Sequence, residues 1–247
     1  MLRSELHSLG VEIVTVCLEL AGAEAARPYV EAAAPEHPSL VDEAHVMDSL
    51  FGVVNVPSAI WIDEEGMIVR PAEPAWPGPA PRLRVELPEP VLERLRGERL
   101  GNRFAGERER YAAALRDWAA RGAASPYAYG PEDVVARSQP RSPDESRAAA
   151  HFELAQHLWT ARRREPALEH FRAAHRLQPD NWTYKRQAWS LVSRETTSGE
   201  AGRFVQMALP GEEDAWPFES DFWSDVRALG ERPYYPNTLE EVDAADA

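Results

Sequence analysis

Cysteine and lysine are almost absent from this sequence. Cys17 is the single cysteine, which excludes an intrachain disulfide and any zinc site built from several thiolates. Lys185 is the single lysine, and 27 basic against 41 acidic residues give a formal net charge of −14. Such an acidic chain repels phosphate backbones, so we expect no nucleic-acid partner. The densest basic run, Arg162 to Arg164, is typical of a solvated turn.

Long apolar runs are also lacking. No stretch approaches the roughly 18 consecutive apolar residues that span a bilayer, so we predict no membrane span. The apolar stretch near the N-terminus is interrupted by Glu12 and Glu19 and lacks the h-region and cleavage site of a secretory signal. We therefore expect the chain, as written, to be cytoplasmic.

The first 70 residues alternate between strand and helix patterns. Residues 11–18 read VEIVTVCL, which is typical of a strand covered on both faces in a parallel sheet. The expected elements are a strand at 11–18, a helix at 23–34, a short strand at 39–41, a helix at 43–51 and a hairpin of strands at 59–63 and 67–70. The hairpin turn is Glu64-Glu65-Gly66, with both glutamates facing solvent. This succession indicates an α/β layer.

Beyond residue 70 the composition changes. Seven prolines within residues 71–90 predict an extended linker or surface loop. Helices follow at 91–100 and 103–121, and Ser142-Pro143-Asp144-Glu145 is a helix-start signal. The acidic tail at 212–247 is rich in aromatic residues, so we expect most of it to pack on the body of the protein.

The segment 148–181 carries a helical-repeat pattern. Its spaced residues are Leu154, Leu158, Ala167, Phe171, Ala174 and Pro179. Small alanines allow two helices to cross closely, Phe171 fills the groove between them and Pro179 ends the second helix. The pattern is similar to one tetratricopeptide (TPR) unit, and Trp182 to Val192 resembles the first helix of a following unit.

The N-terminal region resembles a known family. The runs VEIVTVCLE and LVDEAHVMDSLFGVVNVPSAIWIDEEGMIVR, between Gly10 and Arg70, are similar to thioredoxin-like redoxins of the TlpA/ResA group. The resemblance implies a thioredoxin-like α/β fold followed by a helical TPR-like region. The expected parts are a partial thioredoxin-like domain at 1–70, a proline-rich linker at 71–90, a helical region at 91–211 with its TPR-like unit at about 148–181, and the tail at 212–247.

The resemblance also implies a substrate-binding position. Pro57 matches the family's cis-proline, whose geometry exposes the backbone of Val56 to pair with an extended substrate strand. The alternative is that Pro57 starts a strand in the trans form. Ser58 stands where the family commonly has threonine.

The family's redox motif, a Trp-x-x-Cys-x-x-Cys run, is absent. Residues 2–9 would represent only the last turns of its helix, and the strand that lies between 11–18 and 59–63 in the family would precede Met1. We therefore expect a chain truncated at its N-terminus, which by itself is inactive and lacks any catalytic residue. A selenocysteine codon read as a stop would explain the truncation, and an export signal could have been lost with it.

Other candidate sites have simpler interpretations. Cys17, inside the apolar strand, is read as a small buried side chain rather than a nucleophile. Asp42, His45 and Asp48 could share a helical face and bind a metal, but the family context predicts an ordinary surface helix. Two histidine pairs, at 151 and 157 and at 170 and 175, point to different sides of their helices. We expect no metal or cofactor site.

One aromatic and basic cluster leaves two interpretations open. It comprises Trp182, Tyr184, Lys185, Arg186 and Trp189. The cluster could form a peptide-binding wall or pack at the end of the helical array.

Two functions follow as hypotheses. The first is a thiol–disulfide oxidoreductase or antioxidant redoxin in its complete form, which acts on a disulfide or peroxide substrate. The alternative is a non-catalytic thioredoxin-fold and TPR module that binds a protein or peptide partner.

Overall fold

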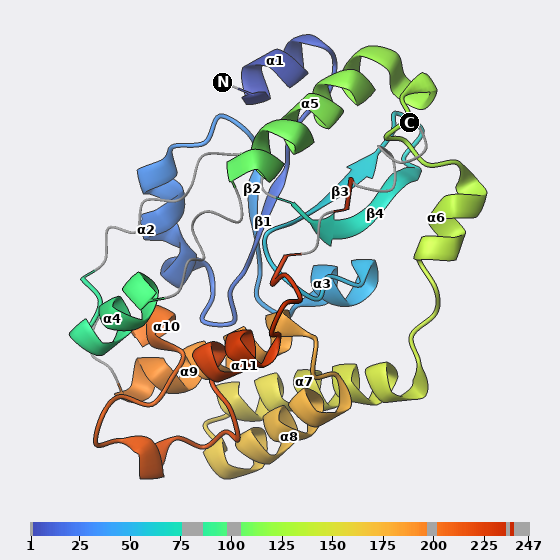
Figure 1. Ribbon diagram of the computed structural model, residues 1–247. Coiled ribbons are helices and arrows are strands. Elements are labelled where there is room, and N and C mark those ends of the chain that lie inside the picture. The colour runs from blue at the N-terminus through green and yellow to red at the C-terminus, as the bar shows by residue number, and fades with distance from the viewer. Residues whose placement is uncertain (1, 76–85, 98–104, 197–201, 236–237, 240–247) are drawn as a thin grey trace. The chain divides into compact units, whose positions relative to one another are not determined.

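The computed structural model describes residues 2–75, 86–97, 105–196, 202–235 and 238–239 (Figure 1). The chain forms two compact units. The first comprises residues 1–79, 104–140 and 237–247, and the second comprises 80–103 and 141–236. The first mixes helices with short strands, and the second is helical. The chain therefore does not divide at the expected linker, because the helices at 105–137 belong with the strands.

The first unit follows the expected order of elements. In chain order it contains α1 (Leu2–Ser8), β1 (Thr15–Leu18), α2 (Ala23–Ala33), β2 (Ser39–Asp42), α3 (Val46–Phe51), β3 (Ser58–Ile62), β4 (Ile68–Pro74), α5 (Ala105–Arg121) and α6 (Pro131–Arg137). Strand β1 is shorter than predicted, because its pairing with β2 begins only at Thr15. Strand β4 is longer and includes Pro71 and Pro74, which the sequence assigned to the linker. Half of that linker, 76–85, lies outside the described residues.

The strands form two separate pairs. Strand β1 is parallel to β2, with Thr15 opposite Ser39 and Leu18 opposite Asp42. Strands β3 and β4 form an antiparallel hairpin, whose turn contains Gly66 at a φ of 81°. No backbone pairing joins the two sheets within the described part of the chain.

One hydrophobic cluster unites the first unit. Trp61 of β3 stacks on Trp118 of α5, with ring centroids 5.0 Å apart, and Leu6 of α1 belongs to the same cluster. Val11 and Ile13, in the segment that leads into β1, pack against it. Helices α1 and α5 lie side by side (Figure 1). The segment before β1 thus shares a core with β3, although no backbone pairing joins the two sheets within the described residues.

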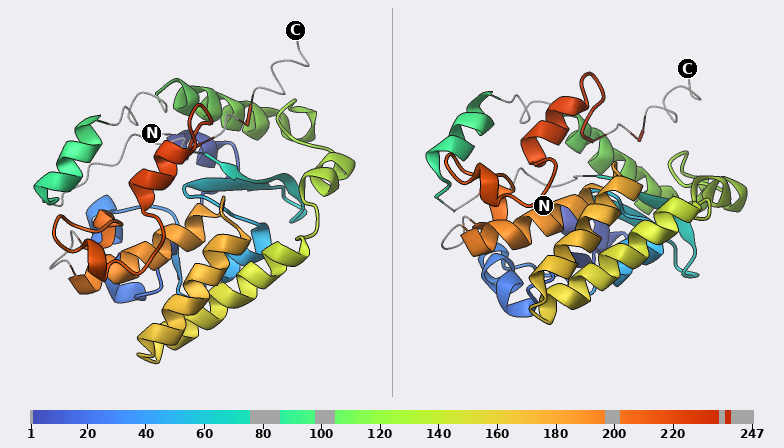
Figure 2. Two further views of the ribbon diagram at one scale, coloured as in Figure 1. Left: turned by 60° about the horizontal axis from the view of Figure 1, so that its bottom comes forward. Right: turned by 90° about the horizontal axis from the view of Figure 1, so that it is seen from below.

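The second unit is built around a helical hairpin. Its helices are α4 (Glu89–Gly97), α7 (Pro143–Thr160), α8 (Arg164–Leu177), α9 (Trp182–Thr196), α10 (Gly202–Val205) and α11 (Phe222–Ala228). Helices α7 and α8 pack along each other as an antiparallel pair (Figure 2). Ser142 caps α7: its side chain accepts from the Glu145 amide, and the Glu145 carboxylate accepts from the Ser142 amide.

Burial in this hairpin follows the repeat pattern with one exception. Leu158, Ala167, Phe171 and Ala174 are buried, as the spacing predicts. Leu154, which also belongs to the pattern, is 42% exposed. Phe152 and Ala155 carry the buried face of α7 at that level.

The described part of the tail packs as expected. Phe218, Trp223, Tyr234 and Leu239 are all buried. Trp223 of α11 joins Val91, Val205 and Met207 in the core cluster of the second unit. Within the described ranges, no helix combines the length and the apolar character that a bilayer crossing requires.

Candidate functional site

The turn before β3 is held by its own polar groups. The peptide bond between Val56 and Pro57 is cis, the conformation that the sequence predicts. Buried Asn55 accepts the Val56 amide proton on its Oδ1 atom at 2.9 Å, and its carbonyl accepts from the Ser58 hydroxyl at 2.6 Å. The Pro57 carbonyl accepts from the Ala75 amide at 3.0 Å, beside β4. The Val56 N–H, which a substrate strand would need, therefore already has an acceptor.

Cys17 offers no dithiol chemistry. It is half-buried in β1, opposite Val41 of β2. With no second cysteine in the sequence, this thiol cannot form a disulfide within the chain. The substrate-binding role of Val56 and Pro57 stays a prediction, and any redox chemistry at this turn requires a second reacting group.

The Asp42, His45 and Asp48 trio adopts a different arrangement from the expected surface helix. His45 and Asp48 are each 3% exposed, and His45 Nδ1 lies 2.9 Å from Asp48 Oδ2. His45 can pair with Asp48 because its φ of 55° turns the chain sharply before α3. Asp42 instead accepts the Met47 amide proton on Oδ2 at 2.7 Å and the Ala44 amide proton on Oδ1 at 3.3 Å. No group of three or more potential ligands for a metal occurs among the described residues.

The histidines of the second unit pair across helices rather than along them. His151 of α7 and His170 of α8 face each other, with their Nδ1 atoms 2.7 Å apart. Burial, His170 and two arginines lower the pKa of His151. Sequence spacing missed this pair because a helical hairpin brings residues 19 positions apart into contact. The pair could have been predicted only by aligning the residues of α7 with those of α8 in the packed hairpin.

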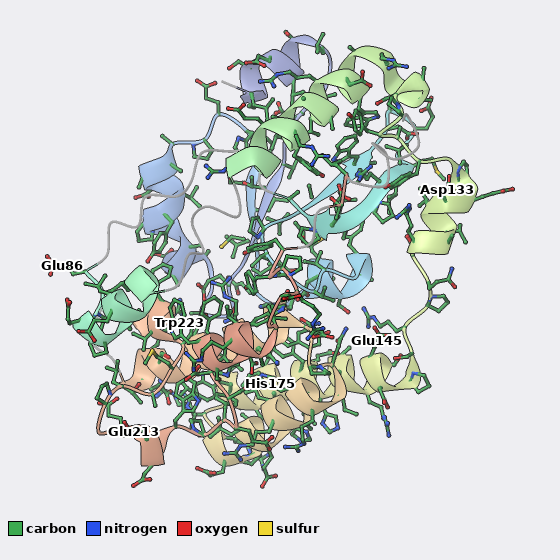
Figure 3. The ribbon with its side chains drawn as sticks, in the orientation of Figure 1. Glu86, Asp133, Glu145, His175, Glu213 and Trp223 are labelled. Atoms are coloured by element: carbon green, nitrogen blue, oxygen red, sulfur yellow. The ribbon has the colours of Figure 1, made fainter. Side chains whose placement is uncertain are left out.

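His175 has a different environment. It lies on α8 (Figure 3), and its ring stacks on Phe218 with centroids 5.1 Å apart. Burial lowers the pKa of His175 to about 3, and the charge of Lys185 contributes. His175 is thus a neutral core residue at physiological pH.

The aromatic and basic cluster of α9 packs inside the second unit. Trp182, Tyr184, Lys185 and Trp189 are buried, and Lys185 Nζ lies 2.6 Å from Asp225 of α11. The packing interpretation is therefore the correct one, and these residues form no exposed peptide-binding wall.

A shallow groove of about 590 Å³ lies elsewhere in this unit. It runs between α8, the end of α9 and the segment at 214–219, and aromatic and acidic side chains line it, among them Trp159, Glu165, Glu195, Asp214, Trp216 and Phe218. Arg164 covers one face of Trp159, with its guanidinium carbon 4.0 Å from the ring centroid. Arg172 donates from Nε to the Pro217 carbonyl and so fixes the 214–219 segment against α8. Arg164 also forms an ion pair with Glu195, and Glu165 and Asp214 add acidic side chains to the lining of the groove.

Comparison of the chain with known protein families, curated proteins and solved structures finds no match.

Proposed function

We propose that the first unit is a thioredoxin-like domain of the TlpA/ResA type, and that it is the substrate-binding part of a thiol–disulfide oxidoreductase whose reacting thiol or selenol lies outside these 247 residues. The observation that carries the proposal is the arrangement of strands. A parallel pair and an antiparallel hairpin lie in one unit but are not hydrogen-bonded to each other within the described residues, and the segment that leads into β1 packs on the same cluster as β3. In thioredoxin-like domains, one strand joins such pairs and leads to the redox-active cysteine.

The backbone directions in β1 support this proposal. The Thr15 amide donates to the Pro38 carbonyl, and the Glu19 amide donates to the Asp42 carbonyl, so the odd-numbered residues face β2. Peptide groups alternate along a strand, so those of Val16 and Leu18 point away from β2. Within the described residues β1 pairs with β2 alone, so its other edge is open to a further strand.

Strand β3 has a comparable edge. The Asp63 amide donates to the Met67 carbonyl, and the Pro57 carbonyl accepts from the Ala75 amide. The backbone N–H and C=O groups of the odd-numbered residues of β3 therefore point toward β4. The peptide groups of Ile60 and Ile62 therefore point away from the hairpin. Two open edges in one unit are an aggregation hazard unless a strand covers them.

Exposed apolar side chains accompany these edges. Val14 is 52% exposed, Leu40 is 53% exposed and Ile62 is 46% exposed. Leu40 lies beside Val16, and Ile62 points to the opposite face from buried Trp61, so all three side chains lie on the sheet faces that α1 and α5 leave uncovered. The proposed domain would place additional structure over this surface.

The proposal assigns a role to the turn at Val56 and Pro57. An extended disulfide substrate would pair with the Val56 backbone, and Asn55 would release the Val56 amide as the substrate binds. Asn55 thereby holds the turn in place before the substrate arrives.

The test is a dithiol-dependent insulin-reduction assay. The 247-residue chain should be inactive, whereas a chain extended through the in-frame upstream DNA should reduce insulin. Replacing the upstream cysteine or selenocysteine with serine should abolish that activity. The proposal fails if the upstream frame encodes no such residue, or if the extended chain is as inactive as the shorter one.

A second candidate is the non-catalytic binding module, and the groove of the second unit favours it. Trp216 offers aromatic surface, while Glu165 and Asp214 add negative charge. A basic peptide with an apolar side chain would fit this chemistry. Titration with such a peptide should change the tryptophan fluorescence, and Trp216→Ala should weaken binding. Equal affinity of an acidic peptide would contradict this function.

A further inference from the structure

The contact between His151 and His170 lies in the α7–α8 hairpin and is independent of the redoxin proposal. The two Nδ1 atoms are 2.7 Å apart and the ring centroids are 5.0 Å apart. The distance between the centroids exceeds the Nδ1–Nδ1 distance by roughly two ring radii. Each Nδ1 atom therefore lies close to the line between the two ring centres, and the two nitrogens point at each other. One Nδ1 must therefore carry a proton and donate it, while the other accepts it with its lone pair.

We propose that His151 and His170 form a two-histidine site for a borderline divalent metal ion, of the class of Zn²⁺, Ni²⁺ or Cu²⁺, which links α7 to α8. The ion takes the place of the single proton between the two Nδ1 atoms; the histidine that gives up this proton takes one from solvent on its Nε2 atom, so both imidazoles stay neutral and no net proton is released. Each imidazole then binds the ion through a lone pair, and water molecules complete the coordination. Imidazole nitrogen is a preferred ligand for all three ions.

The site requires the two rings to tilt, so that their lone pairs converge on the ion, and to move apart. Two nitrogens that are each about 2.0–2.1 Å from a tetrahedral ion stand roughly 3.3 Å apart. The Nδ1 atoms must therefore separate by a few tenths of an ångström. Both rings are only half-buried, and the terminal torsion of histidine is broad, so rotation of the rings can provide this distance.

The surrounding charges permit a cation. Arg147 and Arg176 act on His151 and oppose its protonation. Each has its own carboxylate partner: Arg147 pairs with Asp144, and Arg176 lies 3.1 Å from Glu219. Both arginine side chains are exposed, so solvent and salt screen their charges.

The site joins the two most closely packed helices of the unit. An ion bound to both of them stabilises the hairpin, because the unfolded chain does not hold His151 and His170 together. At a free ion concentration of one hundred times the Kd, the folding equilibrium constant should rise about a hundredfold.

The test is a calorimetric titration of the untagged chain with NiCl₂, ZnCl₂ and CuCl₂. We expect one ion per chain, with Cu²⁺ bound most tightly. His151→Gln and His170→Gln should each weaken binding by at least about tenfold, since loss of a group that merely orients a ligand already has such an effect. His157→Gln, on the exposed side of the same helix, is the matched control and should bind as wild type.

A second measurement needs no variant. In long-range ¹H–¹⁵N spectra of the wild-type chain, added Zn²⁺ should shift the imidazole signals of His151 and His170 and leave those of His157 in place. The proposal is overturned if the His151 and His170 signals do not move, if both glutamine variants bind as wild type, or if binding does not saturate at one ion per chain.

Discussion

Arg70 and Glu73, three residues apart on β4, form a buried ion pair with 2.5 Å between Nε and Oε1. The Arg70 side chain has no exposed surface. It also donates to the carbonyls of Tyr127 and Thr238 and lies over the rings of Trp61 and Tyr129. One guanidinium therefore ties β4 to the segment after α5 and to the described end of the chain.

This arrangement predicts a large effect of Glu73→Gln. The substitution removes the charge that balances a fully buried arginine, so the free energy of unfolding should fall by about 3–5 kcal/mol. Urea denaturation measures the change. Arg121→Met, which breaks an exposed pair with Asp117, is the control and should cost less than about 1 kcal/mol. A comparable loss in both variants would contradict the special role of Arg70.

The neutral state of His175 predicts a pH dependence. An unfolded histidine titrates near pH 6.5, whereas the pKa of His175 in the fold is about 3. Below pH 6.5 the unfolded chain binds a proton at this position and the folded chain does not. The free energy of unfolding is therefore not reduced by His175 above pH 6.5, and it decreases as the pH falls toward 3.

His175→Gln isolates this part of the pH dependence. Between pH 7.5 and pH 4.5, the wild-type chain should lose about 2–3 kcal/mol more unfolding free energy than the variant. Denaturation at the two pH values measures the difference, and His157→Gln should behave as wild type. Parallel pH profiles of wild type and His175→Gln would show that His175 protonates freely in the fold.

The capping box at Ser142 predicts a smaller local effect. Ser142→Ala removes the acceptor of the Glu145 amide at the start of α7 (Figure 3) and should cost about 1 kcal/mol. Ser146→Ala, at an exposed position one turn further along the helix, should have little effect. Thermal unfolding of the two variants under one condition checks the difference, and equal melting temperatures would contradict it.

The open strand edges predict weak self-association. Leu40→Lys and Ile62→Lys place charge on exposed apolar positions, so each should reduce association and change the unfolding free energy by no more than about 0.5 kcal/mol. Leu154→Lys, at the exposed leucine of α7, should not alter association. Sedimentation velocity compares the three variants. A wild-type chain that stays monomeric at its highest soluble concentration would contradict the prediction.

Local sequence signals predicted most individual elements. The Glu-Glu-Gly turn and the Ser-Pro-Asp-Glu start of α7 lie where the sequence placed them, and the β-branched run before Glu19 forms a strand over its second half. These signals depend on a few neighbouring residues, so one sequence suffices to recognise them.

Contacts between distant segments were beyond that reasoning. The spacing of apolar residues in α5 shows which side chains are buried, but it does not show which element they pack against. Trp118 stacks on Trp61 of β3 rather than on the following helices. The same limit applies to His151 and His170, whose contact depends on the register of two helices. His45 and Asp48 form a third example, because the left-handed backbone at His45 gives no sequence signal.

In the proposed domain, one further strand joins the edges of β1 and β3 that are open among the described residues. Amide hydrogen exchange, read by NMR, tests it most directly. In the 247-residue chain, the amides of Val16 and Ile60 should exchange much faster than that of Cys17, which points toward β2. In the chain extended through the upstream frame, Val16 and Ile60 should become as slow as Cys17. Slow exchange at both positions in the shorter chain, or unchanged fast exchange in the extended one, would contradict the account.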